Sequence, residues 1–254
     1  MGITVEGLRR TYGSVTAVAD LSLTVAPGEI VGLIGPNGAG KTTTLRCLAG
    51  ILRPTSGRIV LAGLDTAQSP LEARRQLAFM PDEPHLFEYM TVEEHLRLVG
   101  RLYGVADIDA RTAPLLDELE LVGRERLLPA ELSRGMRQKV VIACGLVRNP
   151  PVLLFDEPLT GLDPLGIRRM RDTIIRRARD GAAVLLSSHM LPLVQEVCTR
   201  VVIMHQGRKI ADGTVEELAA RADLAEAGSN LEQIFLRVTG HNAPAGEPSQ
   251  APDA

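Results

Sequence analysis

The stretch of this sequence best suited to chemistry combines three glycines, a lysine and two adjacent threonines. It reads Gly35, Pro36, Asn37, Gly38, Ala39, Gly40, Lys41, Thr42 and Thr43. Glycine lacks the Cβ atom that would prevent tight backbone curvature, so successive N–H groups can point inward at phosphate oxygens. Lys41 would supply a positive charge for terminal phosphates, and the Thr42 hydroxyl an oxygen ligand for Mg²⁺. The segment therefore predicts a nucleotide phosphate site, called the P-loop below.

The flanking segments have the pattern that such a loop needs. An apolar run from Ile30 to Ile34 precedes it, and a helical pattern follows at Leu45, Leu48, Ala49 and Leu52. A loop between a buried strand and a helix gains the unpaired N–H groups and positive dipole end of the helix start. This pattern alone leaves kinases, motors and transport ATPases open. A GTPase is disfavoured, because the sequence has no Asn-Lys-x-Asp segment for reading guanine.

Two further candidate groups come directly after short apolar runs. Asp156 and Glu157 follow the run 152–155, and His189 follows the run 182–186. Adjacent carboxylates at the end of a buried strand are costly unless a cation or proton is near. Ligands of doubly wound sheets bind at the carboxyl ends of strands, so these groups and the P-loop can share one crevice. By themselves the same residues also fit a solvated acidic turn and a surface histidine.

Composition limits the classes of protein to consider. The 254 residues include 28 basic and 31 acidic ones, a net charge of −3. The chain therefore lacks the overall excess of basic residues expected of a protein that binds nucleic acid. Three cysteines without metal-ligand spacing, Cys47, Cys144 and Cys198, indicate buried thiols in a reducing compartment. No apolar run approaches the roughly 18 residues of a membrane span. We expect a soluble, cytoplasmic chain whose membrane role, if any, comes through another polypeptide.

The first part of the chain predicts strands. Residues 3–25 alternate between apolar and polar side chains, which indicates an antiparallel sheet beside the nucleotide core. Tyr12 falls in the first loop of that sheet, where it is either an aromatic platform for adenine or a surface tyrosine. Further strands are predicted at 58–61 and 77–80. The second of these leads into a loop that contains Asp82.

From Thr91 the apolar period becomes helical. Thr91 and Glu94 predict a capping box, and Ser133 predicts the N-cap of a later helix. Because a strand pattern resumes at Val152, we expect an inserted helical lobe at about 84–150 within a core lobe of about 1–83 and 151–220. A strand hairpin near 201–210 and a helix at about 229–239 follow. Residues 241–254 have little to bury, and we expect them to be disordered.

Together these stretches resemble the nucleotide-binding domain of the ABC ATPase family, over residues 1 to about 240. The matching motifs, in family order, are the P-loop, a signature-like segment at 132–136, the strand that ends in Asp156 and Glu157, a D-loop-like segment at 160–163, and His189 as the switch histidine. The resemblance implies an α/β P-loop NTPase fold, with a mixed sheet core, an antiparallel β subdomain and an inserted α-helical subdomain. It also favours the functional interpretations of Tyr12, Glu157 and His189 over the surface ones.

The family resemblance implies the ATP-binding and hydrolysing subunit of an ABC transporter. Its cofactors would be ATP and Mg²⁺, with Tyr12 and the P-loop on the nucleotide and the metal held by Thr42, Asp82 and Asp156. Its partners would be a second copy or a homologous ATPase subunit, arranged head-to-tail around two ATP molecules, and a polytopic membrane permease at the inner face of the membrane. No nucleic acid is expected.

The resemblance also assigns roles around the γ-phosphate. Glu157 would be the general base, His189 would hold the γ-phosphate, and Lys41 would neutralise it. Ser133 and the Gly135 N–H would cap the ATP bound by the opposite subunit, and Asp163 would connect the two sites.

Two positions depart from the commonest family pattern. The signature has Arg134 and Met136 in place of Gly and Gln, and Asp82 stands where the family usually has Gln. These departures resemble a branch of single-cassette subunits, often exporters, that pair with separate membrane proteins. The alternative is a soluble ABC-type ATPase acting on DNA or ribosomes, but those relatives carry a coiled-coil insertion or two cassettes. The transported substrate, the permease and the role of the last helix stay open.

Overall fold

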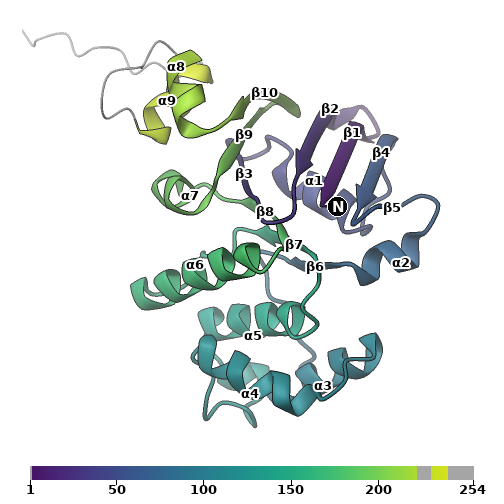
Figure 1. The fold of residues 1–254 in the computed structure, drawn as a ribbon, viewed down its shortest axis with the longest axis vertical. Coiled ribbons are helices and arrows are strands. Elements are labelled where there is room, and N and C mark those ends of the chain that lie inside the picture. Colours follow the sequence, from purple (N-terminus) through teal and green to yellow (C-terminus); the bar gives the residue numbers. More distant parts are fainter. Residues whose placement is uncertain (1, 222–229, 240–254) are drawn as a thin grey trace, which may run out of the picture.

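A computed structural model describes residues 2–221 and 230–239, which build one ten-stranded sheet with helices packed around it (Figure 1). In spatial order the strands are β5 (Leu64–Asp65), β4 (Ser56–Leu61), β1 (Ile3–Tyr12), β2 (Val15–Val25), β10 (Arg208–Gly213), β9 (Arg200–His205), β3 (Ile30–Ile34), β8 (Ala183–Ser187), β7 (Val152–Asp156) and β6 (Leu77–Met80).

The parallel part of the sheet forms the centre of the molecule. Every residue of β3, β7 and β8 is buried, as expected for strands covered by helices on both faces. Side chains alternate between the faces: Leu154 joins the core of α1 (Lys41–Leu48), whereas Leu153 and Phe155 join the core of α5 (Arg134–Leu146) and α6 (Pro164–Arg179). Because these strands are parallel, their carboxyl ends meet at one edge.

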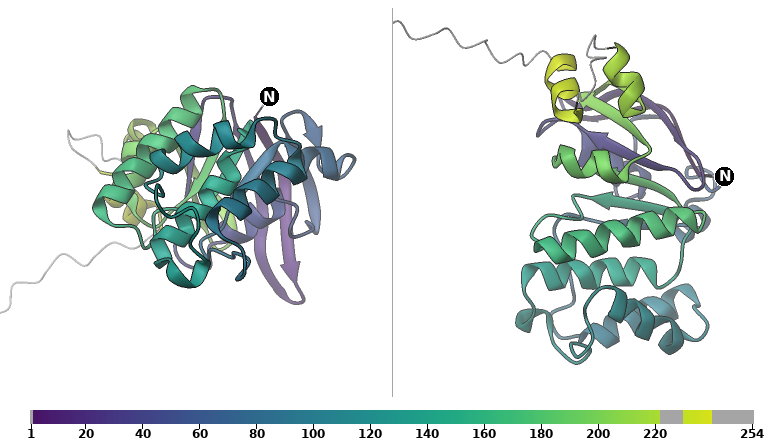
Figure 2. Two further views of the ribbon diagram at one scale, coloured as in Figure 1. Left: turned by 90° about the horizontal axis from the view of Figure 1, so that it is seen from below. Right: turned by 60° about the vertical axis from the view of Figure 1, so that its left-hand side comes forward.

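The antiparallel part of the sheet lies beside this core (Figure 2). Strands β1 and β2 pair with each other, β4 pairs with β1, and β10 connects this part to β9. The predicted antiparallel sheet at 3–25 is therefore confirmed. Tyr12, which we placed in a loop, is instead the last residue of β1 and pairs with Val15, so the loop before β2 is only two residues long.

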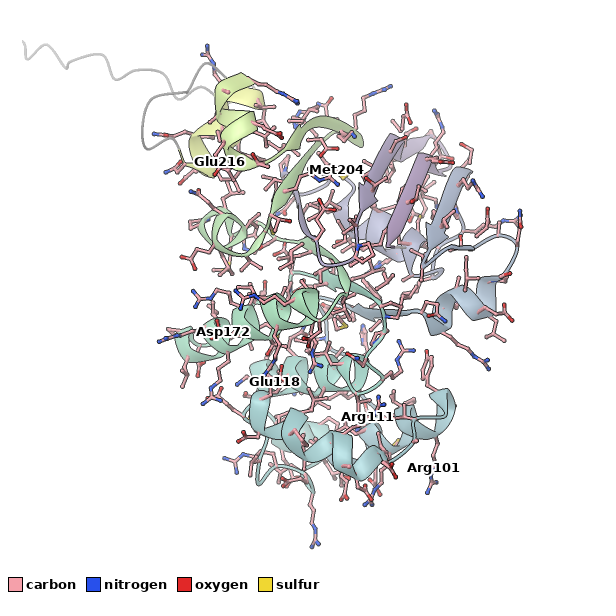
Figure 3. The ribbon with its side chains drawn as sticks, in the orientation of Figure 1. Arg101, Arg111, Glu118, Asp172, Met204 and Glu216 are labelled. Atoms are coloured by element: carbon pink, nitrogen blue, oxygen red, sulfur yellow. The ribbon has the colours of Figure 1, made fainter. Side chains whose placement is uncertain are left out.

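Helices α3 (Val92–Tyr103), α4 (Ile108–Glu118) and α5 form a lobe away from the antiparallel strands, at the bottom of Figure 1. Both predicted caps are present: Thr91 and Glu94 form a capping box, and the Ser133 side chain accepts a hydrogen bond from the Met136 N–H at 3.2 Å. An ion pair also connects the lobe to α6: Glu118 at the end of α4 lies 3.1 Å from Arg177. Figure 3 shows Glu118 next to α6.

Four helices have no counterpart in the sequence predictions: α2 (Pro70–Arg75), α6, α7 (Leu191–Val197) and α8 (Val215–Arg221). Most of them are short, and α6 is so rich in arginine that its apolar stripe is narrow. The predicted last helix is present as α9 (Leu231–Val238), and α1 ends before Leu52. The tail expected to be disordered lies outside the described residues. Across 2–221 and 230–239, none of the helices has the length and apolar character needed to cross a membrane.

Candidate nucleotide site

The P-loop is the connection between β3 and α1, with residues 35–40 in the loop and Lys41, Thr42 and Thr43 opening the helix. Gly40 has φ 103°, and a Cβ atom there would lie 2.5 Å from the Ala17 carbonyl oxygen. At Gly35 a Cβ atom would lie 2.4 Å from the carbonyl oxygen of Met204, which is labelled in Figure 3. No side chain caps the first N–H groups of α1, so they are available to an anion.

Lys41 folds back into this loop. Its ammonium donates hydrogen bonds to the carbonyl oxygens of Gly35 at 2.7 Å and of Pro36 at 3.3 Å, and the residue is only 8% exposed. Burial lowers the pKa of Lys41, and the negative charges of Glu157 and Asp156 partly offset that effect. The charge is thus held where a phosphate would approach, close enough to both carboxylates to interact with them.

Three oxygen groups from three elements meet beside α1. The hydroxyl of Thr42 donates to Asp156 Oδ1 at 3.2 Å, and the hydroxyl of Ser187 donates to the same oxygen at 2.6 Å. Asp156 is 2% exposed, so its carboxylate is desolvated and relies on these donors. A hydroxyl next to a carboxylate is the kind of hard oxygen set that Mg²⁺ takes together with water and phosphate oxygens. The residues present therefore fit the metal that the sequence predicts.

Ser187 was missed by sequence reasoning. It follows an apolar run, as Asp156 does, and the register of the parallel pair sets the two residues opposite each other. A comparison of strand ends could have identified it, since both residues come last in neighbouring strands.

Glu157 and His189 form a pair at the same edge. The Nδ1 atom of His189 lies 2.8 Å from Glu157 Oε2, and the His189 N–H donates to that oxygen at 3.3 Å. Glu157 has φ 49°, a left-handed conformation that costs a non-glycine residue of order 1 kcal/mol, and its own N–H is held by the carbonyl oxygen and hydroxyl of Ser187. Contacts of its backbone N–H with Ser187 and of its carboxylate with His189 thus fix the orientation of Glu157.

The signature-like segment is held by the rest of its own chain. Ser133 caps α5, and a Cβ atom on Gly135 would lie 2.8 Å from the carbonyl oxygen of Gly161. The start of α5 therefore packs on the D-loop-like segment, and Asp163 in turn caps α6 by accepting from the Gly166 N–H at 2.6 Å. Within the described part of the chain, no hydrogen bond or ion pair joins Ser133 or Gly135 to the P-loop.

The structure places the two departures from the family pattern together. Asp82 Oδ1 lies 3.7 Å from an Arg134 guanidinium nitrogen, and both side chains are about half exposed. That oxygen is itself buried and accepts no hydrogen bond. Asp82 thus faces Arg134, whereas Thr42 and Asp156, the other two predicted metal ligands, contact each other. The predicted metal set is brought together only in these two members.

Tyr12 is 42% exposed, at the end of β1. The guanidinium of Arg10 lies 4.4 Å from the centre of its ring, so one face of the ring is covered by a cation. In the order of the sheet, β2, β10 and β9 lie between β1 and β3, the strand that leads into the P-loop.

Comparison with known proteins identifies the family that builds such a site. Residues 18–160 match the model of the ABC transporter family. The chain belongs to this family. As an ABC transporter ATP-binding subunit it is an ATP hydrolase, as its P-loop and carboxylates indicate.

Curated ABC proteins match nearly the whole chain. The ABC-type transporter ATP-binding protein EcsA of Bacillus subtilis is 36% identical over 243 residues, which cover 95% of this chain and 98% of EcsA. NatA of the same organism is 39% identical over 225 residues, 87% of this chain and 90% of NatA. The doxorubicin resistance protein DrrA of Mycobacterium tuberculosis is 37% identical over 226 residues, 87% of this chain and 68% of DrrA.

Solved ABC structures share the fold. The ATP-binding subunit of an ABC transporter superposes with a TM-score of 0.89 at 37% identity, covering 94% of this chain and all of the other. A dimeric bacterial ABC transporter cassette gives a TM-score of 0.78 at 23% identity, over 84% of this chain and 98% of the other. The predicted P-loop NTPase fold is confirmed.

Proposed function

We propose that this ABC subunit dimerises head-to-tail around two Mg-ATP molecules and drives a separate membrane subunit of an exporter. The observation that carries the proposal is the joint placement of Lys41, Asp156, Glu157 and His189 at the carboxyl edge of β3, β7 and β8, with the signature segment held elsewhere. One chain thus supplies most of a hydrolytic site and presents the remaining piece on another surface.

In this proposal the chain's own residues divide the work of phosphoryl transfer. Lys41 exchanges its carbonyl partners for phosphate oxygens, and Thr42 and Asp156 would hold Mg²⁺, which would supply positive charge for the leaving phosphates. Glu157 accepts a proton from a water that attacks the γ-phosphorus, and the bond from that phosphorus to the bridging oxygen of ADP breaks. His189 orients the Glu157 carboxylate through its 2.8 Å contact and holds the γ-phosphate.

The second copy supplies what one chain lacks. The start of α5 has its first N–H groups, the Ser133 hydroxyl and a glycine at one exposed end, which suits a phosphate arriving from outside. We place Ser133 and Gly135 over the γ-phosphate of the opposite chain. Packing of Gly135 against Gly161 would connect that contact to Asp163 and α6.

The membrane partner is proposed to dock on the loop after β6 and the helical lobe. Phe87 and Tyr89 are 62% and 89% exposed there, and Phe87 lines a cavity of about 390 Å³ together with Ile51, Tyr103 and Arg148. Exposed aromatic rings around a hollow favour a protein partner. The export direction is supported by the names of relatives: doxorubicin resistance in DrrA and Nod factor export in another. The chain would thus sit in the cytoplasm, at the inner face of the membrane.

Dimer formation is tested with Glu157→Gln, which keeps the shape of the side chain and removes the base. With Mg-ATP this variant should elute at twice the monomer mass by light scattering, and with Mg-ADP as a monomer. Glu72→Gln, an exposed change on α2, is the matched control and should behave as the parent chain. A Glu157→Gln chain that stays monomeric at saturating Mg-ATP contradicts the proposed dimer.

The partner class is tested by co-purification from membranes of the source cell, followed by mass spectrometry. Recovery of a protein with about six apolar spans supports the transporter, and Phe87→Ser with Tyr89→Ser should reduce that recovery. Leu165→Ser, an exposed apolar residue on α6, serves as control. Recovery of ribosomes or DNA in place of a membrane protein would favour the soluble alternative.

A further inference from the structure

Helix α9 reaches the nucleotide site. A cavity of about 320 Å³ is lined by residues 35–37 of the P-loop, by Ser188, His189 and Leu191, and by Phe235 of α9. Residues 35–37 belong to the loop assigned to the nucleotide phosphates, and His189 is the residue placed at the γ-phosphate. Phe235 is the one lining residue that comes from the end of the described chain, and its ring is the largest apolar group in the cavity wall.

The packing of α9 explains why its position is tied to that of the site. Leu231 and Ile234 are fully buried in a cluster with Ile34, the residue immediately before the P-loop, and Val194 of α7. The Leu231 N–H also donates to Gln195 Oε1 on α7 at 2.9 Å. Figure 1 shows α9 next to α7, which begins two residues after His189. Helix α9 therefore packs against β3, which leads into the P-loop, and against α7, which follows His189.

Phe235 differs from its buried neighbours on α9 because it is partly exposed to the cavity. Leu231 and Ile234 are buried within the apolar cluster, whereas Phe235 is half-buried, packs against that cluster and also lines the cavity. His189 is held at one side by Glu157, through Nδ1 and the main-chain N–H, yet 60% of its side chain is exposed. Among the described residues no hydrogen bond is made by its Nε2 atom. The imidazole is thus held by Glu157 on one side and lines the same cavity as Phe235 and Leu191.

We propose that Phe235 is a positioning residue for His189. Its ring and the imidazole line one cavity, where the ring limits rotation of the imidazole away from Glu157 and the P-loop. This rests on the role proposed above for His189 in hydrolysis. A misplaced reacting group loses rate while the binding contacts of the substrate survive. The signature of a positioning role is therefore a lower kcat with an unchanged affinity for ATP.

The test compares Phe235→Ala, Phe235→Leu and Leu236→Ala in the full chain. Leu236 is the next residue on α9, is 38% exposed and does not line the cavity, so its replacement is the matched control. Phe235→Ala should lower kcat about three- to tenfold while the calorimetric Kd for ATP changes less than about twofold. Phe235→Leu, which restores apolar volume, should recover most of the rate, and Leu236→Ala should match the parent chain.

A second pair of variants separates this inference from the proposed function. In a His189→Ala background, Phe235→Ala should cause no further loss of kcat, since the residue it positions is gone. If His189→Ala lowers kcat and Phe235→Ala does not, the positioning role is refuted and the proposed hydrolytic role of His189 stands. If His189→Ala itself has the parental kcat, both the positioning role of Phe235 and the proposed hydrolytic role of His189 are refuted. Should Phe235→Ala fail to fold, Phe235→Val removes the ring with a smaller loss of apolar volume, and a folded Phe235→Val chain with the kcat of Leu236→Ala refutes the inference.

Discussion

The carboxyl edge of β3, β7 and β8 and the start of α5 both present groups suited to phosphate, yet they differ in how complete they are. At the sheet edge, side chains from α1, β7, β8 and the loops after these two strands reach one another directly: Thr42 with Asp156, Asp156 with Ser187, and Glu157 with His189. At the start of α5, the Ser133 hydroxyl accepts a hydrogen bond from its own helix and Gly135 packs on residues 161–162. Folding of one chain thus assembles the sheet edge, whereas in the dimer proposed above the signature segment acts on the nucleotide of the opposite chain.

The largest effect is expected at the sheet edge. Replacing Glu157 by Gln should lower steady-state phosphate release about 10²- to 10⁴-fold, because a positioned general base contributes that much. ATP binding should persist, since Lys41 and the loop amides are unchanged. Turnover is measured by phosphate release and binding by calorimetry. Near-parental hydrolysis by the purified variant would remove Glu157 from the role of base.

A contrast between Gly135→Ala and Lys41→Ala sharpens the comparison. The added Cβ at 135 would lie 2.8 Å from the Gly161 carbonyl oxygen, so the start of α5 or the D-loop-like segment must shift. We expect at least about a tenfold loss of turnover with parental ATP affinity in the single chain. Lys41→Ala should instead weaken ATP binding about tenfold or more, as hydrogen bonds from a charged group contribute about 1.5–3 kcal/mol. Equal losses of affinity in both variants would contradict the division into two regions.

The buried ammonium of Lys41 predicts a pH dependence of binding. Burial lowers the pKa of Lys41 in the folded chain without nucleotide. Between that lowered pKa and about 10.4, the pKa in the unfolded chain, the unfolded chain binds more protons than the folded one. The folded chain without nucleotide therefore gains stability as pH rises through this range. Phosphates favour the charged form, so ATP binding takes up a proton in this window. The affinity should fall as pH rises through the lowered pKa, by up to about tenfold per pH unit.

Calorimetry in two buffers of different ionisation enthalpy measures that proton uptake directly. The Lys41→Ala chain is the control and should lack the uptake at alkaline pH. An affinity of the parent chain that is constant from neutral pH to pH 10 would show that Lys41 stays charged without phosphate.

The smallest effect is expected for the contact between Asp82, in the loop after β6, and Arg134 at the start of α5. Asp82 and Arg134 are 3.7 Å apart and about half exposed, so their coupling should be about 0.2–1 kcal/mol and should fall with added salt. A double-mutant cycle with Asp82→Asn and Arg134→Gln, read by denaturant unfolding at low and high salt, measures it. Additive losses at low salt would mean that the two departures from the family pattern are independent.

Local features were predicted well because they depend on neighbours in the chain. The strand at 30–34 is a continuous apolar run, the glycines of the P-loop allow local backbone turns, and the capping box of Thr91 with Glu94 closes within four residues. The helices that were missed, α6 and α7 above all, have short or narrow apolar stripes, so packing rather than periodicity makes them stable.

What the sequence by itself determined is the set of chemical groups: a phosphate loop, two carboxylates, a histidine, a capped signature helix, and their order along the chain. Only the tertiary structure decided which groups meet. Parallel register puts Ser187 on Asp156, the lobe brings Arg134 to Asp82, and α9 brings Phe235 to the cavity of His189. The physical reason is that such contacts join residues far apart in sequence, and only the packing of the whole core sets the distances between them.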